Sequence, residues 1–223
     1  MRDQYHDDLD HITDDLVEIT RLAGSAINKA TTALLEADLS AAEAVISGDA
    51  AIDALYEDIE NRALELLARQ QPVASDLRTV MTSLRMVADI ERMGDLALHI
   101  AKVARLRYPA SAIPLELQAT VLEMGQVSQR IVTKCASVIA GRDLDMAAEL
   151  ERDDDAMDAL HRKLFTVLLD PHWRGGTEVA IDVTLCGRYY ERFCDHAVSV
   201  ARRVVFLVTG ERVGASTEAP ADA

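Results

Sequence analysis

The sequence predicts an all-α protein, a tandem repeat of two three-helix bundles with six long antiparallel helices. Of the 223 residues, 49% are hydrophobic but only 4% are aromatic, a composition typical of helices packed on helices. Apolar residues recur at steps of three and four over long segments, and no segment shows the sustained alternation of a strand. The second half of the chain also repeats the pattern of the first, which predicts two copies of one structural unit.

The first half is predicted to hold three helices, over residues 4–36, 40–70 and 75–107. The helical stripe of the first is formed by Leu9, Ile12, Leu16, Ile19 and Ala23. Ser40 and Glu43 have the spacing of a capping box, so we expect Ser40 to cap the second helix. Pro72 should end that helix, because proline has no backbone N–H to continue it.

The second half is predicted to hold three more helices, over residues 115–140, 144–169 and 178–209. Pro109 and Pro114 bracket the link between the halves, and Pro171 lies before the last helix. Gly141 and Gly210 are placed to end the fourth and sixth helices. The tail, residues 211–223, is small and polar, so we expect it to be disordered.

Two shifts align the halves. A shift of 105 residues places 38–55 on 143–160, with identical residues at Asp38, Leu39, Ala42, Asp49, Asp53, Ala54 and Leu55. A shift of 100 places the region around Glu91 on the region around Glu191, so five residues are lost near the turn between the second and third helices. Short connections favour antiparallel neighbours, so we expect one three-helix bundle in residues 1–110 and another in 111–210.

Charge and cysteine content exclude several classes of protein. The net charge is −15 and no cluster of lysine and arginine stands out, so a nucleic-acid partner is not expected. The three cysteines form no C-x-x-C pair, which fits a reducing compartment. The N-terminus is too acidic for a signal peptide, and the apolar run 204–208 is too short to span a bilayer. We therefore expect a soluble cytoplasmic protein without membrane insertion.

Pairs of acids one helical turn apart occur twice in each half, early in its second helix and late in its third. The pairs are Asp49/Asp53 and Glu91/Asp95 in the first half, and Asp154/Asp158 and Glu191/Asp195 in the second. Counted from the intervening turn, the two pairs of each half reach similar heights in antiparallel helices. Four carboxylates should therefore gather on each bundle, provided that the helices turn these faces together.

Like charges one turn apart cost roughly 0.2–0.5 kcal/mol per pair, so shared protons, nearby arginines or a bound cation should offset the repulsion. Solvated pairs with Arg62, Arg92 and Arg192 as partners would explain any single pair. Four repeated pairs favour a hard cation instead. Ligation by carboxylates alone suits iron(III), manganese or magnesium, whereas zinc more usually recruits histidine or cysteine.

The histidines do not complete the motif of a di-iron enzyme, which needs Glu-x-x-His on two helices. The nearest sequence is Asp158-x-x-His161. His99 lies one turn after Asp95 and could reach the acids, but Ser199 replaces it in the second half. The sequence also has no glycine-rich phosphate loop and no nucleophile motif.

The motifs 91-ERMGD-95 and 191-ERFCD-195 resemble those of the PhoU family of bacterial phosphate-transport regulators. The resemblance covers residues from about 5 to 210, including the tandem halves and a Gln71–Pro72 turn followed by 76-DLR-78. It implies a cytoplasmic, metal-binding adaptor rather than an enzyme, which negatively regulates the phosphate-starvation response and phosphate uptake. It also implies that the partners are a phosphate ABC transporter and its sensor histidine kinase, and we expect the protein to be a homodimer.

The resemblance further implies the metal ligands, because family sites use E(D)-x-x-x-D pairs that bind iron or zinc. These pairs correspond to Glu91, Asp95, Glu191 and Asp195, with Asp49, Asp53, Asp154 and Asp158 as partners. The second copy departs by having Cys194 where the first has Gly94, so the two sites can differ in shape or occupancy. Two other hypotheses stay open: a carboxylate-bridged metalloenzyme of helical-bundle type, and a helical scaffold that binds no metal.

Overall fold

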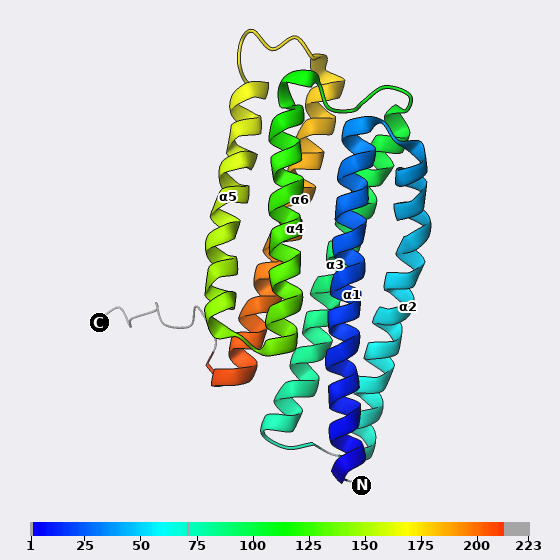
Figure 1. Cartoon of the computed structure of the whole chain (residues 1–223), viewed down its shortest axis with the longest axis vertical. Helices are drawn as coiled ribbons and strands as arrows, with labels where there is room; N and C mark the ends of the chain where they lie inside the picture. Colours follow the sequence, from blue (N-terminus) through cyan, green and yellow to red (C-terminus); the bar gives the residue numbers. More distant parts are fainter. Residues whose placement is uncertain (1, 71, 212–223) are drawn as a thin grey trace, which may run out of the picture.

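The computed structural model describes residues 2–70 and 72–211, which form six long helices and no strand (Figure 1). The first half contains α1 (Arg2–Glu36), α2 (Leu39–Gln70) and α3 (Ser75–Arg107). The second half contains α4 (Leu115–Gly141), α5 (Leu144–Leu168) and α6 (Gly176–Thr209). The predicted all-α class and the tandem organisation are therefore confirmed.

The two halves meet through two pairs of helices. Within each half every helix contacts the other two, and the contacts between halves are those of α1 with α4 and of α3 with α6. Both cross-pairs run antiparallel, while α2 and α5 lie on opposite flanks (Figure 1). In the part of the chain that the structure describes, α2 touches no helix of the second half. The equivalent helices α3 and α6 therefore lie side by side in the middle of the molecule.

One continuous apolar core fills both halves. The predicted stripe of α1 supplies Ile12, Leu16, Ile19 and Ala23, all buried. On α6, the fully buried Tyr190 shares a hydrogen bond of 2.7 Å between its hydroxyl and that of Thr31 on α1. This bond crosses between the halves and pairs two polar groups whose burial without partners would cost about 1–3 kcal/mol each.

The repeat extends to the turns that start the second helix of each half. Asp38 accepts a hydrogen bond from the backbone amide of Ala41, and Asp143 accepts one from that of Met146, both at 3.0 Å. The prediction that Ser40 caps α2 is therefore wrong, because the helix begins at Leu39 and Asp38 occupies the capping position.

The helix ends differ in part from the expectation. Gly141 is the last residue of α4, but the left-handed residue that follows is Arg142, with φ of 52°. Gly210 ends α6 in the left-handed conformation, φ 79°, as glycine there predicts. The predicted disorder of the tail 211–223 concerns residues that, apart from Glu211, lie outside the described part of the chain.

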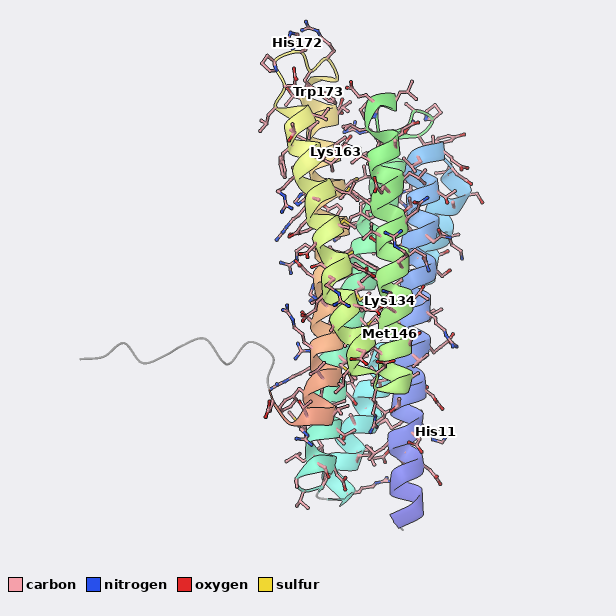
Figure 2. All side chains as sticks on the ribbon, turned by 60° about the vertical axis from the view of Figure 1, so that its left-hand side comes forward. His11, Lys134, Met146, Lys163, His172 and Trp173 are labelled. Carbon is pink, nitrogen blue, oxygen red and sulfur yellow. The ribbon has the colours of Figure 1, made fainter. Side chains whose placement is uncertain are left out.

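The length difference between the halves lies mainly in the second helix. α2 has 32 residues and α5 has 25, while the connection after α5 is the longer one. This connection carries His172 and Trp173 and forms the upper tip of the molecule (Figure 2). At the other end of α5, Lys134 of α4 pairs with Asp153 at 2.9 Å and with Glu149 at 3.1 Å (Figure 2).

Candidate functional site

The first four acids lie where α2 faces α3, and we call them the first quartet: Asp49, Asp53, Glu91 and Asp95. Asp49 is half-buried and Asp53 is exposed on α2. On α3, the side chains of Glu91 and Asp95 keep 22% and 31% of their accessible surface. This places the quartet at the edge of the core, where charge is screened less than on an open surface.

The pKa values show that the carboxylates of the first quartet repel one another. Burial raises the pKa of Asp49, and the charges of Asp53 and Asp95 raise it further. Burial also raises the pKa of Glu91, with additional increases from Asp95, Asp53 and Asp49. Acids on α2 raise the pKa of Glu91 on α3, and Asp95 on α3 raises the pKa of Asp49 on α2. The acidic faces of the two helices therefore point toward each other, which the sequence alone could not establish.

The second quartet, Asp154, Asp158, Glu191 and Asp195, lies between α5 and α6 at the equivalent place. The side chain of Glu191 is only 14% exposed, while Asp195 is exposed. Burial raises the pKa of Asp154 to about 6, and the charges of Asp195, Asp158 and Glu191 contribute to the increase. The repeat therefore reproduces the gathering of four carboxylates.

Arginines partly neutralise both quartets. Arg92 donates a hydrogen bond of 2.9 Å to Asp95 and lies 3.6 Å from Glu91. In the second quartet Arg188, rather than the expected Arg192, pairs with Glu191. Arg62 pairs instead with Asp58, at 2.9 Å. The expectation from sequence is thus right for Arg92, and wrong for Arg62 as a partner of a quartet.

The quartets have the donor chemistry of a site for a hard cation, since every candidate ligand is a carboxylate oxygen. In residues 2–70 and 72–211, however, no three histidine, cysteine, aspartate or glutamate side chains already converge closely enough to hold one metal ion. Binding of a metal would thus require the carboxylate oxygens to move closer together, and Oδ2 of Asp95 is already engaged by Arg92.

Two histidines beside the quartets are used elsewhere. The ring of His99 stacks on that of Tyr189 of α6, with centroids 5.3 Å apart. Nδ1 of His196 lies 3.0 Å from Oδ1 of Asp89 on α3. Oδ2 of Asp89 accepts a hydrogen bond of 2.7 Å from Nε of Arg203. Burial acts to raise the pKa of Asp89, but the hydrogen bonds from His196 and Arg203 outweigh it and lower the pKa.

The sequence does not indicate these contacts between the halves. Nor does it indicate a second ion-pair cluster, in which Arg107 at the end of α3 pairs with Asp182 and Glu178 near the start of α6. Asp182 is only 5% exposed, and its one sequence signal is an acid at a buried position of the helical stripe.

The two quartets differ in how closely their helices approach. A Cβ atom added to Gly94 would lie 2.9 Å from Cδ1 of Ile52, so α2 and α3 pack tightly beside the first quartet. In the second half Cys194 takes this position and is fully buried, with its sulfur 3.6 Å from the hydroxyl of Ser128. The tight approach of α5 and α6 is found instead at Gly187, where an added Cβ would lie 2.6 Å from Leu164.

Two surface hollows lie between α1 and α4, away from both quartets, and a smaller one of about 80 Å³ lies beside the first quartet, with Asp49, Ile52 and Gly94 in its lining. One of about 290 Å³ has Arg21 as its single charged lining residue, and one of about 360 Å³ is lined by Glu36 and Arg130. Neither places a pair of acids or a histidine beside a nucleophile, the arrangement that acid–base or nucleophilic catalysis needs. These hollows therefore give no support to the metalloenzyme hypothesis.

Within the described residues, no helix combines the length and the apolar character that a bilayer crossing needs.

Comparison with known proteins identifies the repeated unit. The PhoU domain family matches residues 16–104 and again residues 121–204. A Mycobacterium tuberculosis protein named phosphate-specific transport system accessory protein PhoU homolog 2 is 50% identical over 210 residues, covering 94% of this chain and 99% of its own length. The Clostridium acetobutylicum PhoU homolog is 30% identical, covering 94% of this chain and 96% of its own length.

Solved structures agree with the sequence relatives. The crystal structure of PhoU from Pseudomonas aeruginosa matches with a TM-score of 0.81 at 28% identity, covering 93% of this chain and 100% of that one. A phosphate transport system regulatory protein PhoU from Streptococcus pneumoniae also gives a TM-score of 0.81, at 26% identity and with coverage of 94% and 99%. The Mycobacterium and Clostridium relatives are named as accessory proteins, and the Streptococcus protein as a regulatory protein. With both copies of the domain matched and the fold shared over nearly its whole length, the chain belongs to the PhoU family.

Proposed function

We propose that this protein is a negative regulator of phosphate uptake and of the phosphate-starvation response. In this role it acts as a cytoplasmic, metal-binding adaptor that links a phosphate ABC transporter to its sensor histidine kinase. Family membership supports the phosphate-related role, because relatives at 46–50% identity carry the name of a phosphate-specific transport system accessory protein. The proposed role is non-catalytic, and we propose that the protein works as a homodimer.

The observation that carries the metal-binding part of the proposal is the gathering of four carboxylates at two equivalent places. Burial and mutual repulsion raise the pKa values of Asp49, Glu91 and Asp154. A bound cation would remove that repulsion, and iron, zinc, manganese or magnesium are the candidates. The metal would supply a fixed positive charge that holds α2 to α3, and α5 to α6.

The quartets fit such an ion better than they fit a purely structural role. A surface ion pair contributes at most about 1 kcal/mol, whereas several half-buried carboxylates on one bundle oppose folding unless a cation offsets them. Arg92 and Arg188 offset one or two acids of each quartet. The remaining acids, which would complete a ligand set across the two helices, are Asp49 and Asp53 in the first quartet and Asp154, Asp158 and Asp195 in the second.

Elemental analysis of protein purified without chelators tests metal binding. We expect the intact protein to contain bound metal. A variant should lack this metal when four acids are changed to alanine: Glu91, Asp95, Glu191 and Asp195. Stoichiometric metal in that variant would refute the assigned ligands. In cells at high phosphate, the same variant should derepress phosphate-starvation genes. Normal repression by a metal-free variant would leave the metal without a regulatory role.

The partner part of the proposal needs its own test. Affinity purification from phosphate-replete cells should recover the ATP-binding subunit of a phosphate transporter and a sensor histidine kinase. A control purification with the isolated affinity tag should recover neither protein. Failure to recover either protein with the intact chain would contradict the adaptor role. In a separate activity assay, turnover of a phosphoester or oxidation of a substrate by the metal-loaded protein would favour the metalloenzyme alternative.

A further inference from the structure

We infer that the exposed face of the central helices α3 and α6 is a docking surface for an acidic amphipathic helix of a partner protein. This docking presupposes the proposed adaptor role, because it needs a partner, but it needs no bound metal. Three features of the face favour such a partner: an excess of positive charge, apolar side chains at both ends, and a width that suits one helix.

The exposed sides of α3 and α6 lie on the same face of the molecule. α3 contacts α1, α2 and α6, and since α1 also contacts α2 and α4, the side of α3 left open lies between α2 and α6. By the same contacts in the second half, the open side of α6 lies between α5 and α3. Both open sides therefore border the seam where α3 and α6 meet, and they face away from α1 and α4 (Figure 1).

One stripe of residues runs along the open side of each helix, and we call the two the central stripes. Steps of three and four residues keep each stripe on one side of its helix. The stripe of α3 consists of Met81, Arg85, Ala88, Arg92, Asp95, His99 and Lys102. The stripe of α6 consists of the residues at the equivalent repeat positions, Ile181, Leu185, Arg188, Arg192, Asp195, Ser199 and Arg202. All are exposed except Asp95 and Ser199, which are half-buried.

The central stripes are basic on a chain that is strongly acidic. Five arginines and one lysine against two aspartates give the stripes a net charge of +4, whereas the whole chain carries −15. Within residues 2–70 and 72–211, Arg85, Lys102 and Arg192 form no ion pair. The other three arginines of the stripes pair with nearby acids, but a guanidinium has five N–H donors and can bind a further carboxylate. The stripes are therefore complementary in charge to an acidic partner.

Contacts across the seam fix which parts of the two stripes lie side by side. Arg107 pairs with Asp182, and the ring of His99 stacks on that of Tyr189. In antiparallel helices, each step back along α3 matches one step forward along α6. The basic parts of the stripes, residues 85–102 and 188–202, therefore lie side by side and form one basic region about 26 Å long.

Exposed apolar side chains lie at both ends of this basic region. At one end, Leu106 of α3 lies near the level of Ile181 and Leu185 of α6. At the other end, Leu77 and Met81 continue the stripe of α3. An amphipathic helix with acids in its middle and apolar residues near its ends could use the whole surface. A nucleic-acid strand would match the basic region but would leave the apolar ends without partners.

The width of the basic region suits one helix better than a broad anionic surface. Packed helices lie about 8–10 Å apart, and a helix with its side chains is about 10–12 Å across, so one helix laid along the seam would contact both stripes. The two quartets border the region on its outer sides, toward α2 and α5. A bilayer of anionic lipids would cover these carboxylates as well, and they would repel it.

The test measures binding of a fluorescent helical peptide by anisotropy. The peptide has glutamates along its middle and leucines near both ends, and a control peptide has glutamine in place of every glutamate. We expect the acidic peptide to bind more tightly, and to lose that advantage at about 0.5 M salt because salt screens exposed charges. Equal binding of the two peptides at low salt would overturn the docking surface.

Charge reversal on the stripes tests where the peptide binds. Arg85→Glu/Arg192→Glu changes two exposed arginines without an ion pair, and should weaken binding of the acidic peptide at least about tenfold. Arg85→Gln/Arg192→Gln should weaken it less, and replaces the first variant if circular dichroism shows that the first is unfolded. The matched control is Arg130→Glu/Arg152→Glu, at exposed positions of α4 and α5 outside the stripes. An equal loss in this control would show that only net charge matters, and would overturn the docking surface.

Competing anions test whether the partner is a peptide helix. Leu106→Ser/Leu185→Ser should weaken the acidic peptide severalfold and leave binding of single-stranded DNA unchanged, because only the peptide uses the apolar end. Single-stranded DNA or phosphatidylglycerol vesicles that bind more tightly than the acidic peptide, and lose binding in Arg85→Glu/Arg192→Glu, would assign the surface to that anion and overturn the proposed helix.

Affinity purification from phosphate-replete cells separates this docking from the adaptor role. The charge-reversed variant should recover less of at least one protein that the intact chain recovers, and the Arg130→Glu/Arg152→Glu control should recover as much as the intact chain. Full recovery by the charge-reversed variant would overturn the docking surface while leaving the adaptor role intact. Recovery of neither partner by the intact chain would overturn the adaptor role, and this docking with it.

Discussion

The first and second quartets occupy equivalent places in the repeat, but their surroundings differ. In the first quartet, burial and the charges of Asp53 and Asp95 raise the pKa of Asp49. The charges of Lys102 and His99 act in the opposite direction and lower it. For Asp154 of the second, burial and four neighbouring acids all raise the pKa, which reaches about 6. The repeat has therefore kept the eight carboxylates while changing the cations that oppose their repulsion.

The difference has a direct sequence origin. Ser199 replaces His99, and Arg202 replaces Lys102 at the equivalent position. Arg202 forms an ion pair of 2.6 Å with Glu151, rather than acting on the second quartet. Asp154 is left with more uncompensated repulsion than Asp49, so the second quartet should gain more at this residue from a bound cation. It should also lose metal sooner as the pH falls toward 6, because protons compete for Asp154.

The largest effect on the free energy of unfolding is expected when the acid pair on the third helix of one half is replaced and the other quartet is left intact. With chelator, Glu91→Ala/Asp95→Ala should raise the free energy of unfolding slightly, because like-charge repulsion is relieved and alanine favours the helix. At a free metal concentration of 100 times Kd, the same variant should lose about 2.7 kcal/mol relative to the intact chain, because the native state loses a ligand. Urea unfolding with and without metal measures both.

Glu191→Ala/Asp195→Ala should show the same reversal of sign, with a larger gain in the presence of chelator. Asp10→Ala/Asp14→Ala is the matched control, since these exposed acids are also one turn apart but belong to neither quartet. If either quartet variant behaves like this control with metal present, its quartet is not a metal site.

A smaller effect on the free energy of unfolding is expected from giving the first half the residue that the second half has at the position of Gly94, which is Cys194. Gly94→Cys places a Cβ and a sulfur against Ile52, whose Cδ1 lies 2.9 Å from the position of the added Cβ. Overpacking of this kind costs about 1–3 kcal/mol, measurable by urea unfolding in chelator. In an Ile52→Ala background, where the overlapping side-chain atoms are absent, the same Gly94→Cys change should cost less. A fully stable Gly94→Cys variant would show that the close approach of α2 and α3 is not enforced at this glycine.

Most of the fold could be predicted because it follows from local patterns. The stripe from Leu9 to Ala23 specifies the buried face of α1, and the matching segments at shifts of 105 and 100 specify the tandem organisation. The residue that caps α2 also has a signal in the sequence. Asp38 and Asp143 are identical in the repeat, whereas Ser40 corresponds to Asp145, so the repeat itself indicated the capping residue.

The quartets could be predicted as candidates, but their surroundings could not. The spacing of Glu91 and Asp95 is a local property, and antiparallel counting brought them level with Asp49 and Asp53. The pairing of Arg107 with Asp182, or of Asp89 with His196, depends on how α3 lies against α6, over separations of 75 and 107 residues. Neither pair has a counterpart at the equivalent repeat positions, so the repeat did not reveal them.

The pH dependence of the free energy of unfolding should show a smaller difference between the quartets. A carboxyl group whose folded-state pKa is raised favours the folded state fully below its unfolded value of 3.8, and that contribution is lost as the pH rises through about 6. Asp154→Asn should therefore stabilise the chelated protein by roughly 1–2 kcal/mol at pH 7, after allowance for solvent screening, and have little effect below pH 4.

Asp49→Asn should give a smaller gain over the same range, because the Lys102 and His99 charges already oppose the rise in the pKa of Asp49. Thermal unfolding in chelator at pH 4, 5.5 and 7 measures both variants. Equal gains for Asp49→Asn and Asp154→Asn would remove the proposed difference between the quartets.

The smallest expected effect tests whether Lys102 is the cause of that difference. Lys102→Met removes the first cation that lowers the pKa of Asp49, so this pKa should rise while the free energy of unfolding changes by only a few tenths of a kcal/mol, since Lys102 is exposed. Arg202→Met is the matched change in the second half, and should leave the pKa of Asp154 where it is because Arg202 is paired with Glu151. Carboxyl carbon NMR titrations of the chelated variants give both pKa values directly. A rise at Asp154 but not at Asp49 would reverse the assignment, and would mean that burial alone, rather than the replacement of a lysine and a histidine in the repeat, separates the two quartets.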